Sequence, residues 1–202
     1  MRRLLAALVA LAALCAPVAA RADGLSSAEL ARLSRRETVI REQTLERGDR
    51  RYVGGITYTL LDAPVTEVAA LIDNPESLRR VLPKTKTARI VGEDQGDALI
   101  ELVQGTSMMQ ATYTIRMRRS AGESRFWLEP SHPHGIDDAW GFFRYQPFVT
   151  PAGEERVLLT YGVLVDVGPG VVRELFEEKL RSALLSVPQL VRREFALRSS
   201  MP

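Results

Sequence analysis

Cysteine and histidine are scarce in this sequence, which has one cysteine, Cys15, and two histidines, His132 and His134, among its 202 residues. Cys15 lies in an N-terminal stretch that we expect to be removed, so the mature chain has no thiol for disulfide formation or nucleophilic chemistry. Its stability must therefore come from an apolar core. No segment after residue 22 is long and apolar enough to cross a bilayer as a helix, which takes about 20 residues.

Residues 1–22 have the three parts of a secretory signal peptide. Two arginines precede an apolar run over residues 4–16, and small residues follow it, so we expect cleavage after Ala20 or Ala22. The apolar run is shorter than the roughly 20 residues of a membrane-spanning helix.

A lipoprotein is the alternative interpretation, in which Cys15 would carry the lipid. Lipoprotein cleavage favours a small residue just before the cysteine, and Leu14 stands there instead. The sequence therefore favours a cleaved signal peptide and predicts a periplasmic or secreted protein.

The charge balance gives no sign of a nucleic-acid partner. The full chain carries 27 Lys+Arg against 25 Asp+Glu, a formal net charge of +2. The signal segment holds three of these arginines and no acid, so its removal leaves 24 basic against 25 acidic residues and a formal charge of −1. Because nucleic-acid binding needs a basic surface, we expect no nucleic-acid partner.

Residues 23–51 are predicted to form an N-terminal helix and a polar linker ahead of one domain over residues 52–198. Ser26 and Glu29 have capping-box spacing at the start of a short amphipathic helix. A strand over residues 37–45 precedes the linker. The mature length, about 180 residues, suffices for a single core.

The domain is predicted to begin with a strand and two short helices and to continue as a series of strands. The helices fall within residues 65–82, and Asn74-Pro75 separates them, since proline suits a first helical turn and breaks a helix interior. Tyr113, Ile115 and Met117 alternate with polar residues, which indicates an antiparallel strand with one buried face. Strands are predicted over residues 56–60, 88–91, 99–103, 111–118, 125–129, 140–148 and 156–167.

A helical pattern covers residues 171–197, and Pro188 within it predicts a kink near residues 184–186. This order of elements predicts an α+β fold in which a curved antiparallel sheet wraps around a long C-terminal helix, with two short helices after the first strand. Such a sheet seldom closes tightly along the whole helix. We therefore expect an apolar cavity for a small molecule between them.

Three segments carry a family resemblance. Residues 62–68, Asp-Ala-Pro-Val-Thr-Glu-Val, form a strand-to-helix entry, residues 72–78 lead towards Pro83, and residues 140–145 read Trp-Gly-Phe-Phe-Arg-Tyr. Their order and spacing resemble the START/polyketide-cyclase-like superfamily, often labelled SRPBCC, over about residues 52–197, and are most similar to its coenzyme Q-binding/START branch. The resemblance implies a helix-grip fold and the binding or transfer of a hydrophobic molecule such as a lipid, sterol, quinone or polyketide.

Aromatic and aliphatic side chains of the strands and the C-terminal helix are the candidates for lining the cavity. If Trp140 and Phe142 face inward, the strand period of two places Arg144 inward as well, where it would meet a polar ligand group; an outward-facing Arg144 is the alternative. Met108 and Met109 form a candidate apolar lip at the entrance. The predicted ligand-binding residues are Tyr58, Tyr113, Ile115, Met117, Trp140, Phe142, Arg144, Tyr161, Phe176, Leu180 and Leu184.

Both histidines and two acids lie in a loop over residues 129–138. A metal site or an acid/base pair would use His132, His134 and Asp137. A polar, solvated turn is the interpretation that we favour, because the spacing matches no standard zinc motif. The sequence therefore predicts no metal, no cofactor and no assigned catalytic residue.

Three functions remain open at the level of sequence. The leading hypothesis is a periplasmic, monomeric carrier for a hydrophobic small molecule, with transient contact to a membrane or an envelope protein. The second is a cyclase/aromatase-like enzyme that uses the loop over residues 132–138. The third is a partner-binding envelope module that docks through residues 24–51.

Overall fold

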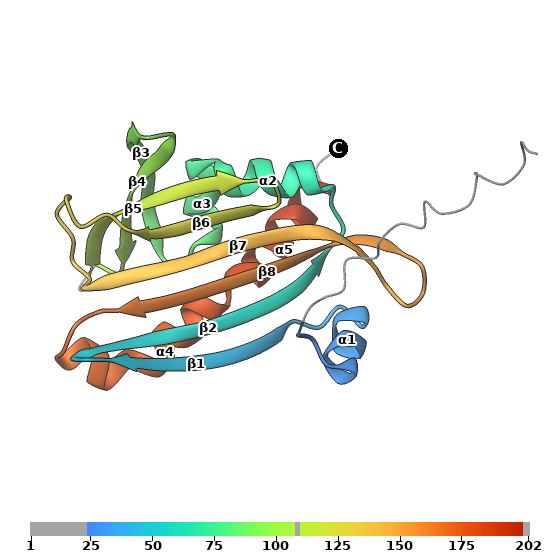
Figure 1. Ribbon diagram of the computed structural model, residues 1–202, viewed down its shortest axis with the longest axis horizontal. Coiled ribbons are helices and arrows are strands. Elements are labelled where there is room, and N and C mark those ends of the chain that lie inside the picture. The colour runs from blue at the N-terminus through green and yellow to red at the C-terminus, as the bar shows by residue number, and fades with distance from the viewer. Residues whose placement is uncertain (1–23, 108–109, 200–202) are drawn as a thin grey trace, which may run out of the picture.

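An eight-stranded antiparallel sheet forms the body of the protein, with strand order β1-β2-β8-β7-β6-β5-β4-β3 (Figure 1). The computed structural model describes residues 24–107 and 110–199. The elements are α1 (Ser27–Ser34), β1 (Val39–Arg47), β2 (Arg50–Leu61), α2 (Val65–Asp73), α3 (Pro75–Val81), β3 (Thr85–Asp94), β4 (Asp97–Gly105), β5 (Gln110–Ser120), β6 (Glu123–Leu128), β7 (Asp138–Val149), β8 (Glu155–Asp166), α4 (Val171–Leu185) and α5 (Val187–Ser199). This is the predicted α+β architecture.

Local sequence signals set the helix ends. The predicted capping box of α1 is present, since the Ser26 hydroxyl accepts from the Glu29 amide and the Glu29 carboxylate accepts from the Ser26 amide. Asn74 caps α3 through its side chain, and Pro75 occupies the first turn. The boundary between the two short helices is therefore confirmed.

The predicted kink in the C-terminal helix is a full break at Ser186, which separates α4 from α5. Pro188 has no amide proton, and its ring would clash with the carbonyl of Leu184 in a continuous helix. The Ser186 hydroxyl donates to the Ala183 carbonyl at 2.7 Å and closes the end of α4. The element that crosses the sheet is thus two helices joined at one residue. No helix among the described residues is long and apolar enough to span a membrane.

The N-terminal segment belongs to the same sheet as the rest of the chain. The predicted strand over residues 37–45 is β1, which pairs with β2 along its whole length, from Val39 with Tyr58 to Arg47 with Arg50. Residues 47–51, expected to be a linker, are the paired ends of the two strands and the tight turn between them, which residues 48–49 form. The polar composition that suggested a linker is that of a turn and of an exposed edge strand.

Two glycines in β2 allow the backbones of three strands to approach closely. Gly54 and Gly55 have φ values of +154° and +145°. A Cβ atom on Gly54 would lie 2.0 Å from the carbonyl oxygen of Val163 in β8, and one on Gly55 would lie 2.1 Å from that of Arg41 in β1. Only glycine fits at these positions, so these residues permit the close approach of β2 to β1 and β8.

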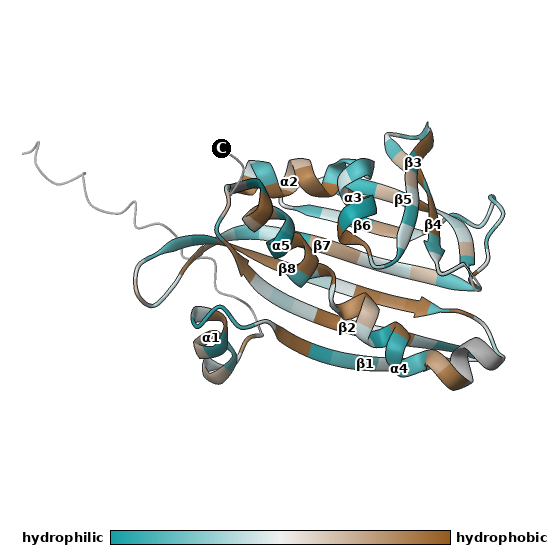
Figure 2. Cartoon of the chain, turned by 180° about the vertical axis from the view of Figure 1, so that it is seen from behind, coloured by the Kyte–Doolittle hydropathy of each residue, from teal (hydrophilic) through white to brown (hydrophobic). Residues whose placement is uncertain are grey.

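The two faces of the sheet carry separate apolar cores. Helices α2 to α5 cover the concave face, and Figure 2 shows α4 and α5 crossing it. The main core there includes Leu61, Ile72, Ile100, Phe143 and Leu185. On the opposite face, α1 packs over a smaller core formed by Leu33, Val39, Tyr58, Leu60, Phe148 and Leu158.

The variant Gly54→Ala should lower the free energy of unfolding by about 3 kcal/mol or more, because its Cβ atom overlaps a backbone carbonyl that cannot move without breaking the β2–β8 pairing. Gly153→Ala is the matched control: Gly153 also has positive φ, +83°, but a Cβ atom there meets nothing within 4 Å. The Gly153→Ala variant should lower the free energy of unfolding by only about 1–2 kcal/mol. Urea denaturation measures the free energy of unfolding of both variants. If the two variants lose the same amount of stability, this account of Gly54 in β2 is contradicted.

Candidate functional site

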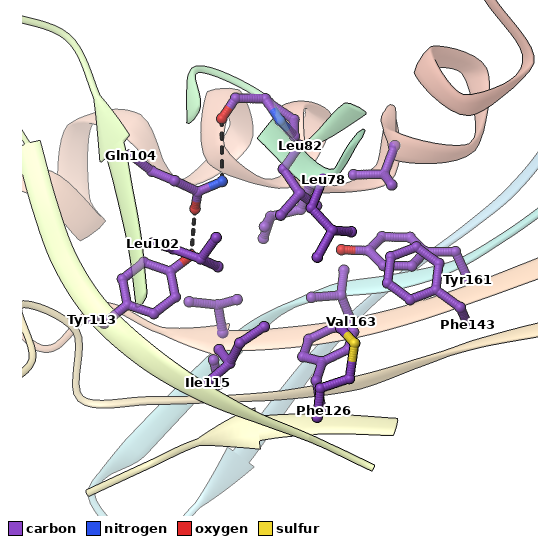
Figure 3. A pocket seen from close by; sticks show the side chains of 16 residues that line it. Leu78, Leu82, Leu102, Gln104, Tyr113, Ile115, Phe126, Phe143, Tyr161 and Val163 are labelled. Carbon is purple, nitrogen blue, oxygen red and sulfur yellow. Dashed lines mark hydrogen bonds between the residues drawn. The ribbon is translucent and has the colours of Figure 1, made fainter. Parts of the chain in front are cut away.

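A cavity lies between the concave face of the sheet and the helices that cover it (Figure 3). The part of this cavity that the centre of a water molecule can occupy has a volume of about 50 Å³. Strands β4 to β8 and the segments around α3, α4 and α5 line it with Leu78, Leu82, Pro83, Leu102, Gln104, Tyr113, Ile115, Met117, Phe126, Ala139, Phe143, Tyr161, Val163, Val165, Leu184 and Val187. The wall is almost entirely apolar.

Three aromatic rings pack together along one side of the cavity. The centroids of Phe143 and Tyr161 are 4.7 Å apart, and those of Phe126 and Phe143 are 5.8 Å apart. The Phe126 ring lies over Gly141, where a Cβ atom would come within 2.5 Å of the ring. These contacts hold the rings of neighbouring strands in fixed positions.

The polar groups of the cavity wall are uncharged. The Tyr113 hydroxyl donates to Gln104 Oε1, and Gln104 Nε2 donates to Thr85 Oγ1 at 2.7 Å and to the Pro83 carbonyl at 3.3 Å (Figure 3). Burial raises the pKa of both Tyr113 and Tyr161 well above the ordinary value, so both phenols are neutral at pH 7. Among the described residues no charged side chain lines the cavity. The site thus suits an apolar and uncharged molecule.

Five of the predicted ligand-binding residues do line this cavity: Tyr113, Ile115, Met117, Tyr161 and Leu184. The alternation over residues 113–117 predicted the inward face of β5 correctly. Phe176 and Leu180 lie on α4, half-buried, and the cavity wall does not include them. Met108 and Met109, the predicted lip, fall outside the described residues.

The prediction that Trp140, Phe142 and Arg144 face the cavity is wrong. In β7 the inward side chains are those of Ala139, Phe143 and Tyr145, whereas Trp140 is 43% exposed on the convex face. Arg144 lies over the Phe142 ring and pairs with Glu123 at 2.6 Å, so it is not available to a ligand in the cavity. Both faces of β7 carry aromatic residues, so the period of two alone does not fix which face is buried.

Tyr58 also lies on the convex face. It belongs to the smaller core beneath α1, and the Arg41 guanidinium lies 5.3 Å from the centroid of its ring.

Sequence analysis missed Gln104 and Phe143 as cavity residues. Extending the alternation of Ile100 and Leu102 by one more step would have identified Gln104, since both of those residues are buried in the main core.

The loop over residues 129–138 lies outside the cavity wall. His134 Nδ1 is 2.8 Å from the Ile136 carbonyl oxygen, and His132 Nδ1 is 3.3 Å from Ser131 Oγ. Neither imidazole nor the Asp137 carboxylate lines the cavity. In the part of the chain that the structure describes, no three metal-ligating side chains come together.

Glu129 fixes the start of this loop and is buried in spite of its charge. It accepts from the Ser131 hydroxyl at 2.6 Å and pairs with Arg116 at 2.7 Å, and these contacts lower the pKa of its carboxyl from 4.5 to about 2. A carboxylate whose pKa is lower in the folded state stabilises the protein above its unfolded pKa, and this contribution is lost as the pH falls from about 4.5 towards 2.

The variant Glu129→Gln should therefore lower the free energy of unfolding at pH 7 by about 1–3 kcal/mol, and the difference from wild type should shrink below pH 4.5. Denaturation at a series of pH values measures this. Glu76→Gln, at a side chain that is 65% exposed, is the control and should give the wild-type profile. A difference at Glu129 that stays constant down to pH 2.5 would show that the charge of its carboxylate does not matter.

No family model and no curated protein matches the chain. Solved structures do match. A STAR-related lipid transfer protein from Xanthomonas axonopodis is 12% identical, with 78% of this chain and 92% of that chain covered and a TM-score of 0.60. A protein from Thermus thermophilus is 14% identical, with 72% and 98% covered and a TM-score of 0.55. The di-domain ARO/CYC protein StfQ of the steffimycin biosynthetic pathway is 10% identical, with 86% and 56% covered and a TM-score of 0.53. The chain therefore has the START-like helix-grip fold that its sequence predicted.

Proposed function

We propose that this protein is a periplasmic binding or carrier protein for a hydrophobic small molecule of the lipid, sterol or quinone class. One observation carries the proposal: the space between sheet and C-terminal helices is lined by apolar and neutral side chains. The similarity in fold to a STAR-related lipid transfer protein supports it. Burial of about 300 Å² of apolar ligand surface would contribute about 7 kcal/mol before the costs of association.

The cavity of this structure is too small for such a ligand. Its volume of about 50 Å³ holds a few water molecules, whereas ligand pockets measure several hundred Å³. Entry therefore requires that a covering element move away from the sheet. We assign this movement to α4, which contributes Leu184 to the cavity wall and is joined to α5 only through the break at Ser186.

A small set of polar contacts holds α4 against the first two strands. Arg51 of β2 pairs with Glu177 at 3.0 Å, and Arg181 donates to Thr44 of β1 at 3.0 Å and pairs with Glu177 at 2.9 Å. At the end of α4, the Thr57 hydroxyl donates to the Leu185 carbonyl at 3.1 Å. Glu177 links Arg51 of β2 to Arg181 of α4, so removing its charge weakens both of these pairs at once.

The cyclase-like alternative receives less support from the geometry. It assigned proton transfer to His132, His134 or Asp137, and all three side chains lie outside the cavity wall. Export is supported by the signal-like composition of residues 1–22, which lie outside the described residues. A monomer that contacts a membrane or an envelope protein only transiently fits this role.

The variant Ala139→Leu should weaken the binding of an apolar fluorescent dye about tenfold. Ala139 is buried and faces the cavity, and the added isopropyl group occupies the space that the ligand needs. Ala196→Leu, at an exposed position of α5, is the control and should bind the dye as wild type does. Dye titration measures both; wild-type affinity in Ala139→Leu would place the ligand elsewhere and overturn the proposal.

The variant Glu177→Gln should speed release of the same dye about twofold to fivefold, because loss of the pairs with Arg51 and Arg181 destabilises the closed position of α4 by about 0.5–1 kcal/mol. Stopped-flow fluorescence measures the rate. The neighbouring Glu178→Gln should leave the release rate unchanged, because Glu178 is 78% exposed and its pair with Arg181, at 3.6 Å, lies within α4 and does not connect the helix to the strands. Equal release rates in all three proteins would rule out α4 as the gate.

A further inference from the structure

The Tyr161 hydroxyl group belongs to the cavity wall and has no hydrogen-bond partner among the residues that the structure describes. Tyr161 lies on β8, is 2% exposed, and directs its hydroxyl into the cavity towards Leu78 and Val163 (Figure 3). Among the described residues none forms a hydrogen bond with this hydroxyl. This hydroxyl borders the cavity with its hydrogen-bonding capacity unused by the described residues, so it can bond to a molecule that enters the cavity.

The other polar groups of the cavity wall are already satisfied within the protein. Both amide protons of Gln104 are donated, to Thr85 and to the Pro83 carbonyl, and its oxygen accepts from Tyr113. The proton of Tyr113 is thereby occupied as well. Tyr161 is thus the hydroxyl of this wall, within the described part of the chain, that can still donate to an incoming molecule.

Packing fixes the direction in which Tyr161 points. Its ring lies 4.7 Å from that of Phe143 and 6.3 Å from that of Phe126, measured between centroids. Both phenylalanines come from neighbouring strands of the sheet and are themselves buried. A donor that is held in one orientation before a ligand arrives loses little entropy on binding, which is the property of a built recognition group.

The electrostatics of the cavity select the kind of group that Tyr161 can meet. No described cavity residue is charged, and burial raises the pKa of the Tyr161 phenol, which stays neutral. A carboxylate or phosphate would therefore lose its hydration with no cation to offset the loss. A carbonyl or hydroxyl oxygen requires no such compensation and needs only one donor.

We propose that Tyr161 is the polar contact of the binding site, and that the ligand is an apolar molecule bearing a neutral carbonyl or hydroxyl oxygen, which the cavity selects over anionic lipids. This inference rests on the proposed carrier function and narrows it to a ligand class. The oxygen binds at Tyr161, and the apolar remainder of the molecule lies along Leu102 and Ile115.

The test compares Tyr161→Phe with wild type against three probes: a medium-chain methyl ketone, the alkane with the same number of heavy atoms, and the ionised fatty acid of the same chain length. Displacement of an apolar fluorescent dye gives each affinity. The variant should bind the ketone about fivefold to tenfold more weakly and the alkane as tightly as wild type does, as expected for loss of one hydrogen bond. Wild type should bind the fatty-acid anion more weakly than the ketone.

Tyr145→Phe is the matched control, because Tyr145 is buried on the same face of the sheet but does not line the cavity. It should leave all three affinities unchanged. Tyr161→Phe removes a hydroxyl that has no described partner, so its melting temperature without ligand should equal or exceed that of wild type. A fall in melting temperature would reveal a structural role for the hydroxyl and contradict the assignment.

The outcomes separate this inference from the proposed function. If wild type binds the alkane and ketone but Tyr161→Phe binds the ketone equally well, the assignment of Tyr161 is wrong while the carrier function stands. If the fatty-acid anion binds as tightly as the ketone, selection for a neutral ligand is wrong. If none of the probes displaces the dye from wild type, the carrier function fails and this inference fails with it.

Discussion

The concave face of the curved sheet is apolar, and the whole structure depends on keeping water from it. Leu185, Val187 and Val191 are almost fully buried where α4 and α5 cross this face. Closely packed side chains fill most of the interface, but around Tyr161 and Leu184 the surfaces of sheet and helices diverge and leave a cavity. The same apolar burial that stabilises the fold therefore also creates the space for a ligand.

Much of the fold could be predicted because its elements carry local signals. The capping residue Ser26, the Asn74-Pro75 boundary and the alternation over residues 113–117 each act within a few residues, and each appears as predicted. Prediction failed where two local interpretations were equally good. Residues 140–145 place aromatic side chains on both faces of β7, and only the packing of Phe143 against Tyr161, a residue on another strand, decides which face is buried.

The site itself could be predicted only in part, because its wall is assembled from distant segments. Leu78, Gln104, Tyr161 and Leu184 come from four parts of the chain and meet only in the folded protein. Tertiary contacts likewise decide whether a polar group of the cavity wall already has a hydrogen-bond partner within the protein. Gln104 and Tyr113 satisfy each other, whereas no described residue bonds to the Tyr161 hydroxyl, and composition alone does not distinguish these cases.

The most direct test of the account is native mass spectrometry of the protein purified from the cells that naturally produce it, followed by organic extraction of whatever is bound. The account predicts one bound molecule per chain, recovered as an uncharged apolar compound with a carbonyl or hydroxyl oxygen, on a polypeptide whose mass shows that residues 1–20 or 1–22 have been removed. A protein that carries no ligand under these conditions, or one that carries an anionic lipid in the cavity, would contradict it.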